Sequence, residues 1–321
     1  MRGIRFIPEN SNINFIGMRW GAFVLSSLLI AASIFMLSKN GLNMGIDFTG
    51  GTVVEIRTPV TPDLEGMRGQ LNSLEFGSVS IQEFGSVEDL LIRLPEQVAP
   101  EGWTPPSEDV TDYNSYVIDV LQESINSIFE GEIVDYRRIE FVGPQVGSEL
   151  KLKGLYAVIF SLLGIMTYIW FRFEWQFGVA AIIALAHDAM ATMGLFAFTG
   201  MEFNLSTVAA ILMIAGYSIN DTVVVFDRIR EDLRKFKKKA LQDVFNLSIN
   251  RTLSRTLMTS VTTLLALIAL YIFGGEVIRG FVDALIFGIL VGTYSSIFVA
   301  SPVLMMMNVK RSTVREAPAS A

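Results

Sequence analysis

The sequence predicts a polytopic α-helical membrane protein with one α+β domain inserted after its first membrane span. The 321-residue chain is 51% hydrophobic and only 18% charged, which is too apolar for an ordinary soluble protein. It contains six apolar runs that are each long enough to cross a bilayer, a task that takes about 20 residues. A single long polar segment, residues 41–150, separates the first run from the second.

We expect six transmembrane helices at these runs. They cover residues 20–37, 154–171, 177–201, 203–226, 256–275 and 281–307. The first run is too long for a cleaved signal peptide, and no small-x-small cleavage site stands clearly before the polar segment. We therefore interpret it as a retained span.

The basic residues predict the orientation, because cytoplasmic loops of membrane proteins are enriched in Lys and Arg. Three basic groups fall on the same side of a six-span chain. They are Arg2, Arg5 and Arg19; Arg228, Arg230, Arg234, Lys235, Lys237, Lys238, Lys239, Arg251 and Arg255; and Lys310, Arg311 and Arg315. Both termini and the basic loop are therefore expected in the cytoplasm, and the large polar segment in the periplasm.

This orientation divides the chain into four parts. Residues 1–40 form the cytoplasmic N-terminus and first span, and residues 41–150 form the periplasmic domain. Residues 151–309 hold spans two to six with a basic cytoplasmic loop at 227–255, and residues 310–321 form a cytoplasmic tail.

The periplasmic segment has the strand and helix signals of a ferredoxin-like domain. The order is βαββαβ, which defines that fold. We expect strands at 52–57, 79–84, 90–94 and 132–142, helices at 63–74 and 110–129, and a proline-rich loop at 99–107.

Part of the basic loop has the pattern of an amphipathic helix. Phe236, Ala240, Leu241, Val244 and Phe245 share one face, with lysines opposite. We expect this helix to lie on the inner leaflet of the membrane, with a solvated connector as the alternative.

Composition excludes several classes of site. The chain has no cysteine, so it has no disulfide, thiol nucleophile or thiolate metal site, and its single histidine excludes a multi-histidine metal site. It lacks the Gly-x-x-x-x-Gly-Lys-Ser/Thr nucleotide-binding loop. We therefore predict no bound cofactor and an energy supply from an ion gradient or a partner. The net charge of −7 sums over two compartments and indicates no nucleic-acid partner.

Asp221 is the most informative residue, because it lies inside the fourth apolar run. An Asp at a membrane helix centre costs about 2.5–3.5 kcal/mol by insertion scales, and such a carboxylate is retained where it is used or paired. We predict a proton or ion site there; the alternative is a hydrogen bond between helices. Arg255 opens the fifth span at a depth that suits an ion pair with Asp221, or it extends to lipid phosphates.

Two further polar residues, His187 and Asp188, lie in the third span, roughly 16 Å from its cytoplasmic end. His187 is a candidate proton relay or a neutral imidazole bonded to a backbone carbonyl. Asp188 is a candidate coupling residue or a helix–helix hydrogen bonder. Small residues, including Gly288 and Gly292, permit close helix contact. We expect the fourth to sixth spans, which carry Asp221, Gly288 and Gly292, to face a partner subunit.

Several motifs resemble those of the SecD/SecF family. Residues 45–51, with Gly45, Asp47, Gly50 and Gly51, resemble its Gly-Ile-Asp-Phe-x-Gly-Gly signature, and residues 141–150 resemble its entry to the second span. Residues 185–194 with His187-Asp188, 216–231 with Asn220-Asp221, and 254–263 with Arg255 are similar to the SecF branch rather than to SecD. The proline-rich loop departs from the family pattern by enlarging the outer domain.

The resemblance implies a non-enzymatic subunit of the bacterial protein-export complex in the inner membrane, within the resistance-nodulation-division superfamily. Such a subunit pairs with SecD and uses the proton gradient, or sodium in some bacteria, to help unfolded preproteins emerge from SecYEG. YajC and YidC are further partners that it implies. The family's coupling carboxylate and its arginine correspond to Asp221 and Arg255, with Asn220 and Asp188 nearby.

Three alternatives remain open on the residues alone. A small-molecule exporter of the same superfamily shares the membrane carboxylate, but it is expected to carry two repeats and a larger outer domain. An intramembrane aspartyl protease would need Asp188 and Asp221 nearly in contact, whereas their expected depths differ by about 7 Å. In a passive scaffold, Asp221 would only pack helices.

Overall fold

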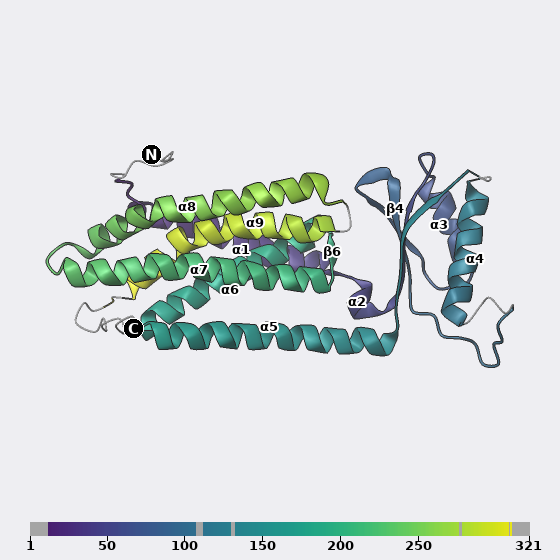
Figure 1. Ribbon diagram of the computed structural model, residues 1–321, viewed down its shortest axis with the longest axis horizontal. Helices are drawn as coiled ribbons and strands as arrows, with labels where there is room; N and C mark the ends of the chain where they lie inside the picture. The colour runs from purple at the N-terminus through teal and green to yellow at the C-terminus, as the bar shows by residue number, and fades with distance from the viewer. Residues whose placement is uncertain (1–11, 107–111, 130–131, 276–277, 308, 310–321) are drawn as a thin grey trace. The chain divides into compact units, whose positions relative to one another are not determined.

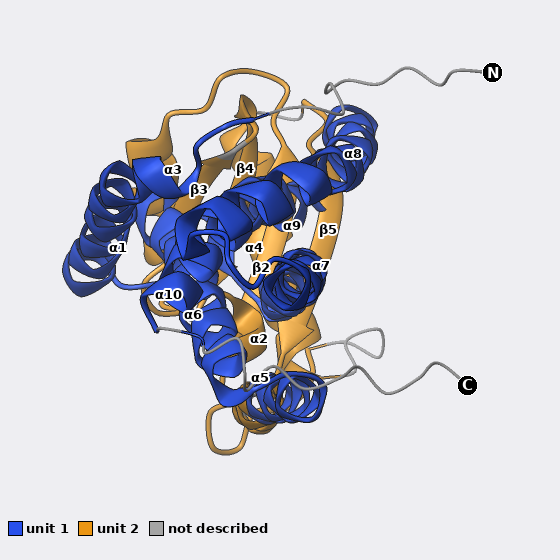
Figure 2. Cartoon of the chain, turned by 90° about the vertical axis from the view of Figure 1, so that its left-hand side faces the viewer, with its two compact units in different colours: residues 1–43, 156–321 blue, residues 44–155 orange. Residues whose placement is uncertain are grey.

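The computed structural model describes residues 12–106, 112–129, 132–275, 278–307 and 309. The chain forms two compact units (Figure 2). The helical unit comprises Met1–Asn43 and Tyr156–Ala321, and the sheet unit comprises Met44–Leu155. Arg2, Arg5, Lys310, Arg311 and Arg315, on which the expected orientation partly depends, lie outside the described residues, as does the 310–321 tail.

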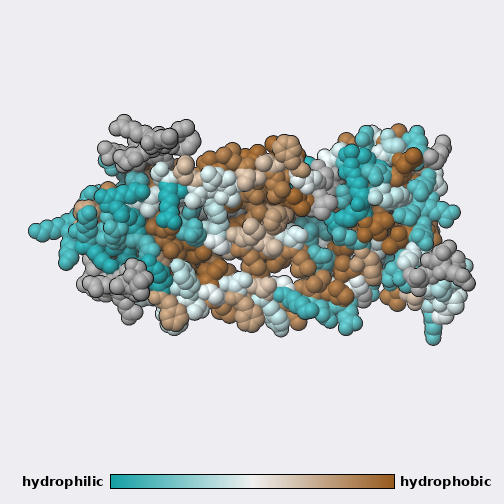
Figure 3. Space-filling model, viewed as in Figure 1, coloured by the Kyte–Doolittle hydropathy of each residue, from teal (hydrophilic) through white to brown (hydrophobic). Residues whose placement is uncertain are grey.

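Six helical segments of the described chain are long and apolar enough to cross a membrane, in agreement with the six predicted spans. They are α1 (Arg19–Asn40), preceded by the short η1 (Ile16–Met18); α5 (Pro144–Arg172); α6 (Trp175–Thr199); α7 (Leu205–Lys235); α8 (Leu241–Phe273); and the combination of α9 (Arg279–Ser295), η3 (Ser296–Ala300) and α10 (Ser301–Met306) (Figure 1). Hydrophobic side chains form a band across the middle of these helices, and hydrophilic ones gather where α7 and α8 are joined (Figure 3).

The spans differ in how much protein surrounds them. In the most apolar 18-residue stretch of each span, 72% of the residues are buried in the sixth span and 56% in α6, but only 6% in α5. Helix α9 packs against α6, α7 and α8. The sixth span is therefore the centre of the bundle, and most of α5 is not covered by the described part of this chain.

Local sequence explains where these helices begin and end. Asn204 caps α7 by accepting a hydrogen bond from the Thr207 amide, and the Thr207 hydroxyl accepts one from the Asn204 amide in return. Gly200 ends α6 in the left-handed conformation, with φ of 71°. The strands β1 (Asn43–Met44) and β6 (Glu202–Phe203) are short additions that the sequence did not indicate.

The basic loop at 227–255 differs from the expectation. Helix α7 continues to Lys235 and α8 already begins at Leu241, so only residues 236–240 connect them. Val244 and Phe245 are fully buried in the main core of the helical unit. The expected separate helix on the membrane surface is therefore wrong: its apolar face packs against protein. We call this end of the bundle the hairpin end.

The sheet unit is a four-stranded antiparallel sheet with two main helices. Its elements follow the chain as α2 (Ile46–Thr49), β2 (Gly51–Arg57), α3 (Leu64–Asn72), β3 (Ser80–Phe84), β4 (Ser86–Leu94), α4 (Tyr113–Ile128) and β5 (Asp135–Val142). The strand order in the sheet is β3-β4-β2-β5. Asp63 and Asp112 cap the two main helices by accepting backbone hydrogen bonds.

Residues of β2 alternate between two cores, which explains why almost the whole strand is buried. Val54 and Ile56 pack with residues of α3 and α4, such as Leu71 and Leu121. Val53 packs in a smaller cluster with Ile46 of α2. This alternation is the period-2 pattern of a strand that is covered on both faces.

The glycine motif forms the turn that leads into this sheet. Gly45 precedes α2, and Gly50 and Gly51 leave it with φ of 71° and 113°. A Cβ atom on Gly51 would also collide with the backbone oxygen of Leu94. Only glycine meets both demands at Gly51, so this residue has a structural role where the chain enters β2.

Candidate functional site

A buried carboxylate at Asp188 joins three helices. Asp188 of α6 is fully buried, and its Oδ2 accepts hydrogen bonds from the hydroxyls of Ser218 on α7 and Ser295 on α9. The Oδ1 atom lies 3.0 Å from Nδ1 of His187. Two hydroxyl donors and the adjacent imidazole nitrogen therefore surround this buried carboxyl group, in keeping with the rule that buried polar groups are hydrogen-bonded.

His187 belongs to this cluster through Nδ1, while its second ring nitrogen, Nε2, does not contact Asp188. If Nδ1 donates to Asp188, Nε2 is the acceptor of the neutral ring. Nε2 is buried and has no hydrogen-bond partner among the described residues. Beside the ring, at 6.2 Å between centroids, lies Tyr294, whose hydroxyl donates to the Ala22 carbonyl of α1.

The irregular sixth span places Ser295 at this site. Its α-helical pattern changes after Ser295 to the π-helical turn η3, directly before Pro302. Proline has no amide hydrogen to continue the ladder, and the Ser301 hydroxyl donates to the Ser296 carbonyl five residues earlier. Such π-helical turns often occur at functional sites.

Asp221 of α7 has a different environment from Asp188. It is 3% exposed, and its Oδ2 is buried without a hydrogen-bond partner in the described part of the chain. Opposite it, α8 brings the Thr259 side chain and the positive charge of Arg255 to act on this carboxylate. A proton or a small cation can therefore bind at the second oxygen without breaking an existing hydrogen bond.

Arg255 does not contact Asp221 directly. Within the described residues no ion pair of 4.0 Å or less joins the two groups, and no hydrogen bond engages the Arg255 guanidinium. Arg255 instead lines a pocket between α7 and α8. The predicted Arg–Asp pair thus remains a prediction: the structure places both groups on facing helices, and the charge of one acts on the other.

Hydroxyl groups continue the polar path one turn beyond Asp221. Tyr217 of α7 donates to Ser260 of α8 at 3.2 Å, and Ser260 lies 2.7 Å from the Thr293 hydroxyl of α9. Thr256, one turn from Ser260, is buried, and its hydroxyl has no hydrogen-bond partner in the part of the chain that the structure describes. The carboxylate of Asp221 therefore borders a group of hydroxyls shared by three helices.

Charged residues at the hairpin end form two networks, one around the half-buried Asp227 and one around the fully buried Asp232. Asp227 accepts hydrogen bonds from Arg172 and Arg230, at 2.7–2.8 Å. Asp232, which is fully buried, accepts from Ser248 at 3.0 Å and from Arg251 at 2.6 Å. These networks fix α7 to α5 and α8, and they explain why the basic residues of this region continue a helix rather than start a loop.

Other predicted site residues lie elsewhere. Asn220 is exposed on the outside of α7, next to Asp221 in sequence but not buried with it. Gly288 and Gly292 are buried against α7: a Cβ atom at Gly288 would collide with Ile214, and one at Gly292 would approach Ser218. The expectation that these two glycines face a partner subunit is wrong, because they permit close packing within this chain.

The sequence alone does not identify the hydrogen-bond partners of Asp188. Ser218 and Ser295 are small residues in apolar runs, and nothing in their immediate sequence marks them as donors to this carboxylate. One signal was available, since Ser218 precedes Asp221 by one helical turn and therefore lies near the same face of α7. Nothing in the sequence sets the register of Ser295 against Asp188.

Family models and curated relatives both match this chain to protein-export membrane proteins. A family model described as protein export membrane protein SecD/SecF, C-terminal, matches residues 121–310, and one for the SecD/SecF GG motif matches residues 35–58. Protein translocase subunit SecF of Rickettsia rickettsii is 46% identical over 303 residues, which is 94% of either chain. SecF of Rickettsia bellii is 44% identical over 308 residues, with 96% of this chain and 97% of the relative covered.

Solved structures agree with the sequence matches. The crystal structure of SecDF, a translocon-associated membrane protein from Thermus thermophilus, superposes with a TM-score of 0.80 and 36% identity over 94% of this chain. SecDF in its super-membrane-facing form gives a TM-score of 0.67 and 34% identity over 96% of the chain. The present chain spans about 40% of the length of each of these SecDF chains.

Proposed function

The chain belongs to the SecF branch of the SecD/SecF family of protein-export membrane proteins, and we propose that it acts with SecD to drive preprotein export with the proton motive force. In this proposal the pair promotes translocation of preprotein through SecYEG and its release on the periplasmic side. Family membership together with six apolar helices makes the chain a multi-pass inner-membrane protein.

The coupling proposal rests on the environment of Asp221. Its carboxylate is buried in an apolar helix, has one oxygen without a partner, and feels the charge of Arg255. Moving one charge through 100 mV releases about 2.3 kcal/mol, which is enough to bias a conformational step. A change of charge at Asp221 alters the attraction between α7 and α8, so proton binding has a direct route to helix movement.

We assign supporting roles to the other polar residues. Asp188, held by Ser218 and Ser295, keeps α6, α7 and α9 in register around Asp221, and His187 offers Nε2 as a proton relay. Asn220 belongs to the coupling group from the exposed side of α7. Sodium is the alternative coupling ion, and the gradient rather than a bound cofactor supplies the energy.

We also propose that the sheet unit lies in the periplasm with a ferredoxin-like fold, and that both termini are cytoplasmic. The βαββαβ order and the antiparallel sheet support this fold. Alkaline phosphatase fused after Pro105 should be active, and the same fusion after Lys238 should be inactive. The reverse pattern would contradict the orientation. Unfolded preprotein and SecD are the partners of this unit, with YajC and YidC as further members of the assembly.

The experiment that tests the coupling proposal is Asp221→Asn in membrane vesicles containing the export machinery. The substitution keeps the size and most of the hydrogen bonding, so the protein should accumulate normally, while gradient-dependent stimulation of preprotein export should disappear. Asp243→Asn is the matched control, because Asp243 is exposed in the first turn of α8. Normal gradient-stimulated export by Asp221→Asn would refute the proposal.

The alternatives fit the observations less well. In the described residues the Asp188 carboxylate is occupied by two serines and His187, and no hydrogen bond joins it to Asp221, which disfavours a shared-proton protease dyad. The relatives are named as protein translocase subunits rather than exporters of small molecules. A passive scaffold would tolerate Asp221→Asn, so the same experiment separates it from the proposal.

A further inference from the structure

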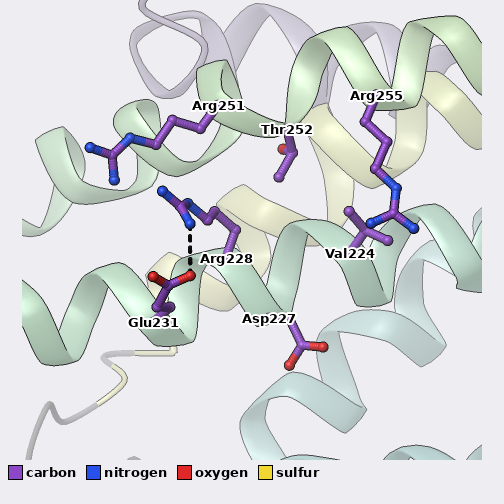
Figure 4. A pocket seen from close by; sticks show the side chains of 7 residues that line it. All are labelled: Val224, Asp227, Arg228, Glu231, Arg251, Thr252 and Arg255. Atoms are coloured by element: carbon purple, nitrogen blue, oxygen red, sulfur yellow. Dashed lines mark hydrogen bonds and ion pairs between the residues drawn. The ribbon is translucent and has the colours of Figure 1, made fainter.

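We propose that the pocket between α7 and α8 at the hairpin end binds a phosphate group supplied by an anionic phospholipid. The pocket is an open hollow of about 530 Å³, and Figure 4 shows the side chains that line it. Three arginines line it: Arg228 of α7, and Arg251 and Arg255 of α8. This inference goes beyond the proposed function and does not depend on it, because it concerns binding by the chain and not transport.

Among the described residues around the pocket, one cation takes part in no ion pair. Arg228 pairs with Glu231 at 2.7 Å and lies 3.5 Å from Asp232, and Arg251 pairs with Asp232 at 2.6 Å. Arg255, in contrast, makes no ion pair or side-chain hydrogen bond with any described residue. Three guanidinium groups therefore face two carboxylates, and the unmatched positive charge points into the pocket.

The remaining acidic residue that lines the pocket, Asp227, does not pair with Arg255. Asp227 points away from the three arginines (Figure 4). Its oxygens accept hydrogen bonds from Arg172 and Arg230 on the opposite side of α7. It is therefore already neutralised, and an oxyanion that enters the pocket meets mainly guanidinium donors.

The pocket lies at the depth of lipid headgroups. Val224, which also lines it, belongs to the apolar part of α7, whereas Arg228 and Glu231 belong to its charged end. The 31 residues of α7 extend about 46 Å, more than the roughly 30 Å hydrocarbon core of a bilayer. The change from apolar to charged residues on both helices thus coincides with the membrane surface, where phosphate groups are concentrated.

Guanidinium chemistry favours phosphate over other anions there. The planar fork of arginine donates two parallel hydrogen bonds to a phosphate, and basic pockets between membrane helices bind anionic headgroups. The pocket volume suits the glycerophosphate part of a lipid, with the acyl chains outside along the exposed face of α8. Free inorganic phosphate shares the same chemistry, so the test must separate the two sources.

The test uses the full chain, purified in a micelle of an uncharged detergent, and a fluorescent phosphatidylglycerol as the probe. Unlabelled phosphatidylglycerol should displace the probe, while phosphatidylcholine and millimolar inorganic phosphate should not. Arg255→Gln and Arg251→Gln should each weaken binding by about tenfold. Lys238→Gln, which removes the same charge from an exposed position outside the pocket, should bind like the parent chain.

A variant that is expected to bind more tightly tests the pocket independently, because misfolding could explain a loss of binding but not a gain. Glu231→Gln removes a carboxylate from the pocket and frees Arg228, so phosphatidylglycerol should bind more tightly than to the parent. Asp221→Asn removes a carboxylate whose charge acts on Arg255, so it should bind the lipid at least as tightly as the parent while losing gradient-stimulated export, which separates this inference from the proposed function. If Arg255→Gln and Arg251→Gln bind phosphatidylglycerol as tightly as Lys238→Gln does, the pocket is not the binding site. If inorganic phosphate displaces the probe as well as phosphatidylglycerol does, the phosphate group does not come from a lipid.

Discussion

The hydroxyl of Ser295 on α9 donates a 2.7 Å hydrogen bond to the carboxylate of Asp188 on α6. The two residues are 107 positions apart in the chain, and both are fully buried. Ser218 of α7 donates to the same oxygen, so a single charged atom holds three helices at one level. The proposed coupling residue Asp221 follows Ser218 by one helical turn, which makes the Asp188 cluster a fixed reference for any movement of α7.

Ser295→Ala should destabilise the helical unit. The change removes one donor from a buried charged acceptor, and hydrogen bonds of this kind in membrane proteins are worth about 1–2 kcal/mol. Thermal unfolding of the purified chain should show the loss. Thr262→Ala is the matched control, since Thr262 is exposed on α8 and bonds only to carbonyls of its own helix; equal stability of the two variants would contradict a structural role for Ser295.

The contrast between Asp188 and Ser295 shows what sequence reasoning can reach. Apolar runs of about 20 residues are imposed by bilayer thickness, so the spans were predictable from length and composition. Charged residues indicate where a helix leaves the membrane, but the helix itself can continue beyond that point. The sequence therefore does not predict that α7 extends to Lys235. The register between distant helices depends on side-chain packing, which a single sequence does not encode in any periodic pattern.

Small residues illustrate the same limit. Gly194 of α6 and Gly216 of α7 look alike in sequence, yet their surroundings are opposite. A Cβ atom on Gly194 would lie 2.8 Å from the backbone Cα of Ser33 on α1, whereas one on Gly216 would meet nothing within 4 Å. Sequence predicted that glycines allow close helix contact, but only the structure identifies which contact depends on them.

Gly194→Ala should therefore loosen the packing of α1 on α6. Overpacking of this kind costs about 1–3 kcal/mol, because a backbone atom cannot rotate away as a side chain does. Gly216→Ala is the same chemical change and should be neutral or slightly stabilising, since alanine favours a helix over glycine. Unfolding temperatures of both variants in the same detergent give the comparison, and equal destabilisation would show that the α1–α6 contact is not limiting.

Asp89 predicts an acid-sensitive step in the sheet unit. Arg57 donates two hydrogen bonds of 2.7 Å to this buried carboxylate. These bonds lower the pKa of Asp89 below its ordinary value, outweighing the opposite effect of burial. A carboxyl group whose pKa is lower in the folded state stabilises the fold fully above its unfolded pKa of about 3.9, and this contribution is lost as the pH falls through the folded value.

Urea unfolding of the sheet unit at several pH values should show this loss between about pH 5 and pH 2. Trp103, which packs on Tyr113 and Tyr116, reports on the sheet unit by fluorescence once the other tryptophans are replaced by phenylalanine. Asp89→Asn should lower stability at pH 7 by about 1.5–3 kcal/mol and flatten the acid limb. Glu140→Gln changes a half-exposed carboxylate paired with Arg138 and should leave the acid limb intact.

The relation between Asp221 and Arg255 gives the last prediction. The two face each other on α7 and α8 without a direct ion pair within the described chain, so their attraction is available to be made in another step of the cycle. Arg255→Lys should impair gradient-stimulated export, because a point ammonium lacks the planar fork of a guanidinium. In a double-mutant cycle, Asp221→Asn with Arg255→Met should be no worse than the poorer single variant, with a coupling energy of about 0.5–3 kcal/mol. A control cycle combines Asp243→Asn with Arg255→Met. The effects of these two substitutions on export should add, since Asp243 is exposed near the start of α8. If the Asp221 and Arg255 defects simply add as well, the two residues work independently and α7 and α8 are not coupled through this pair.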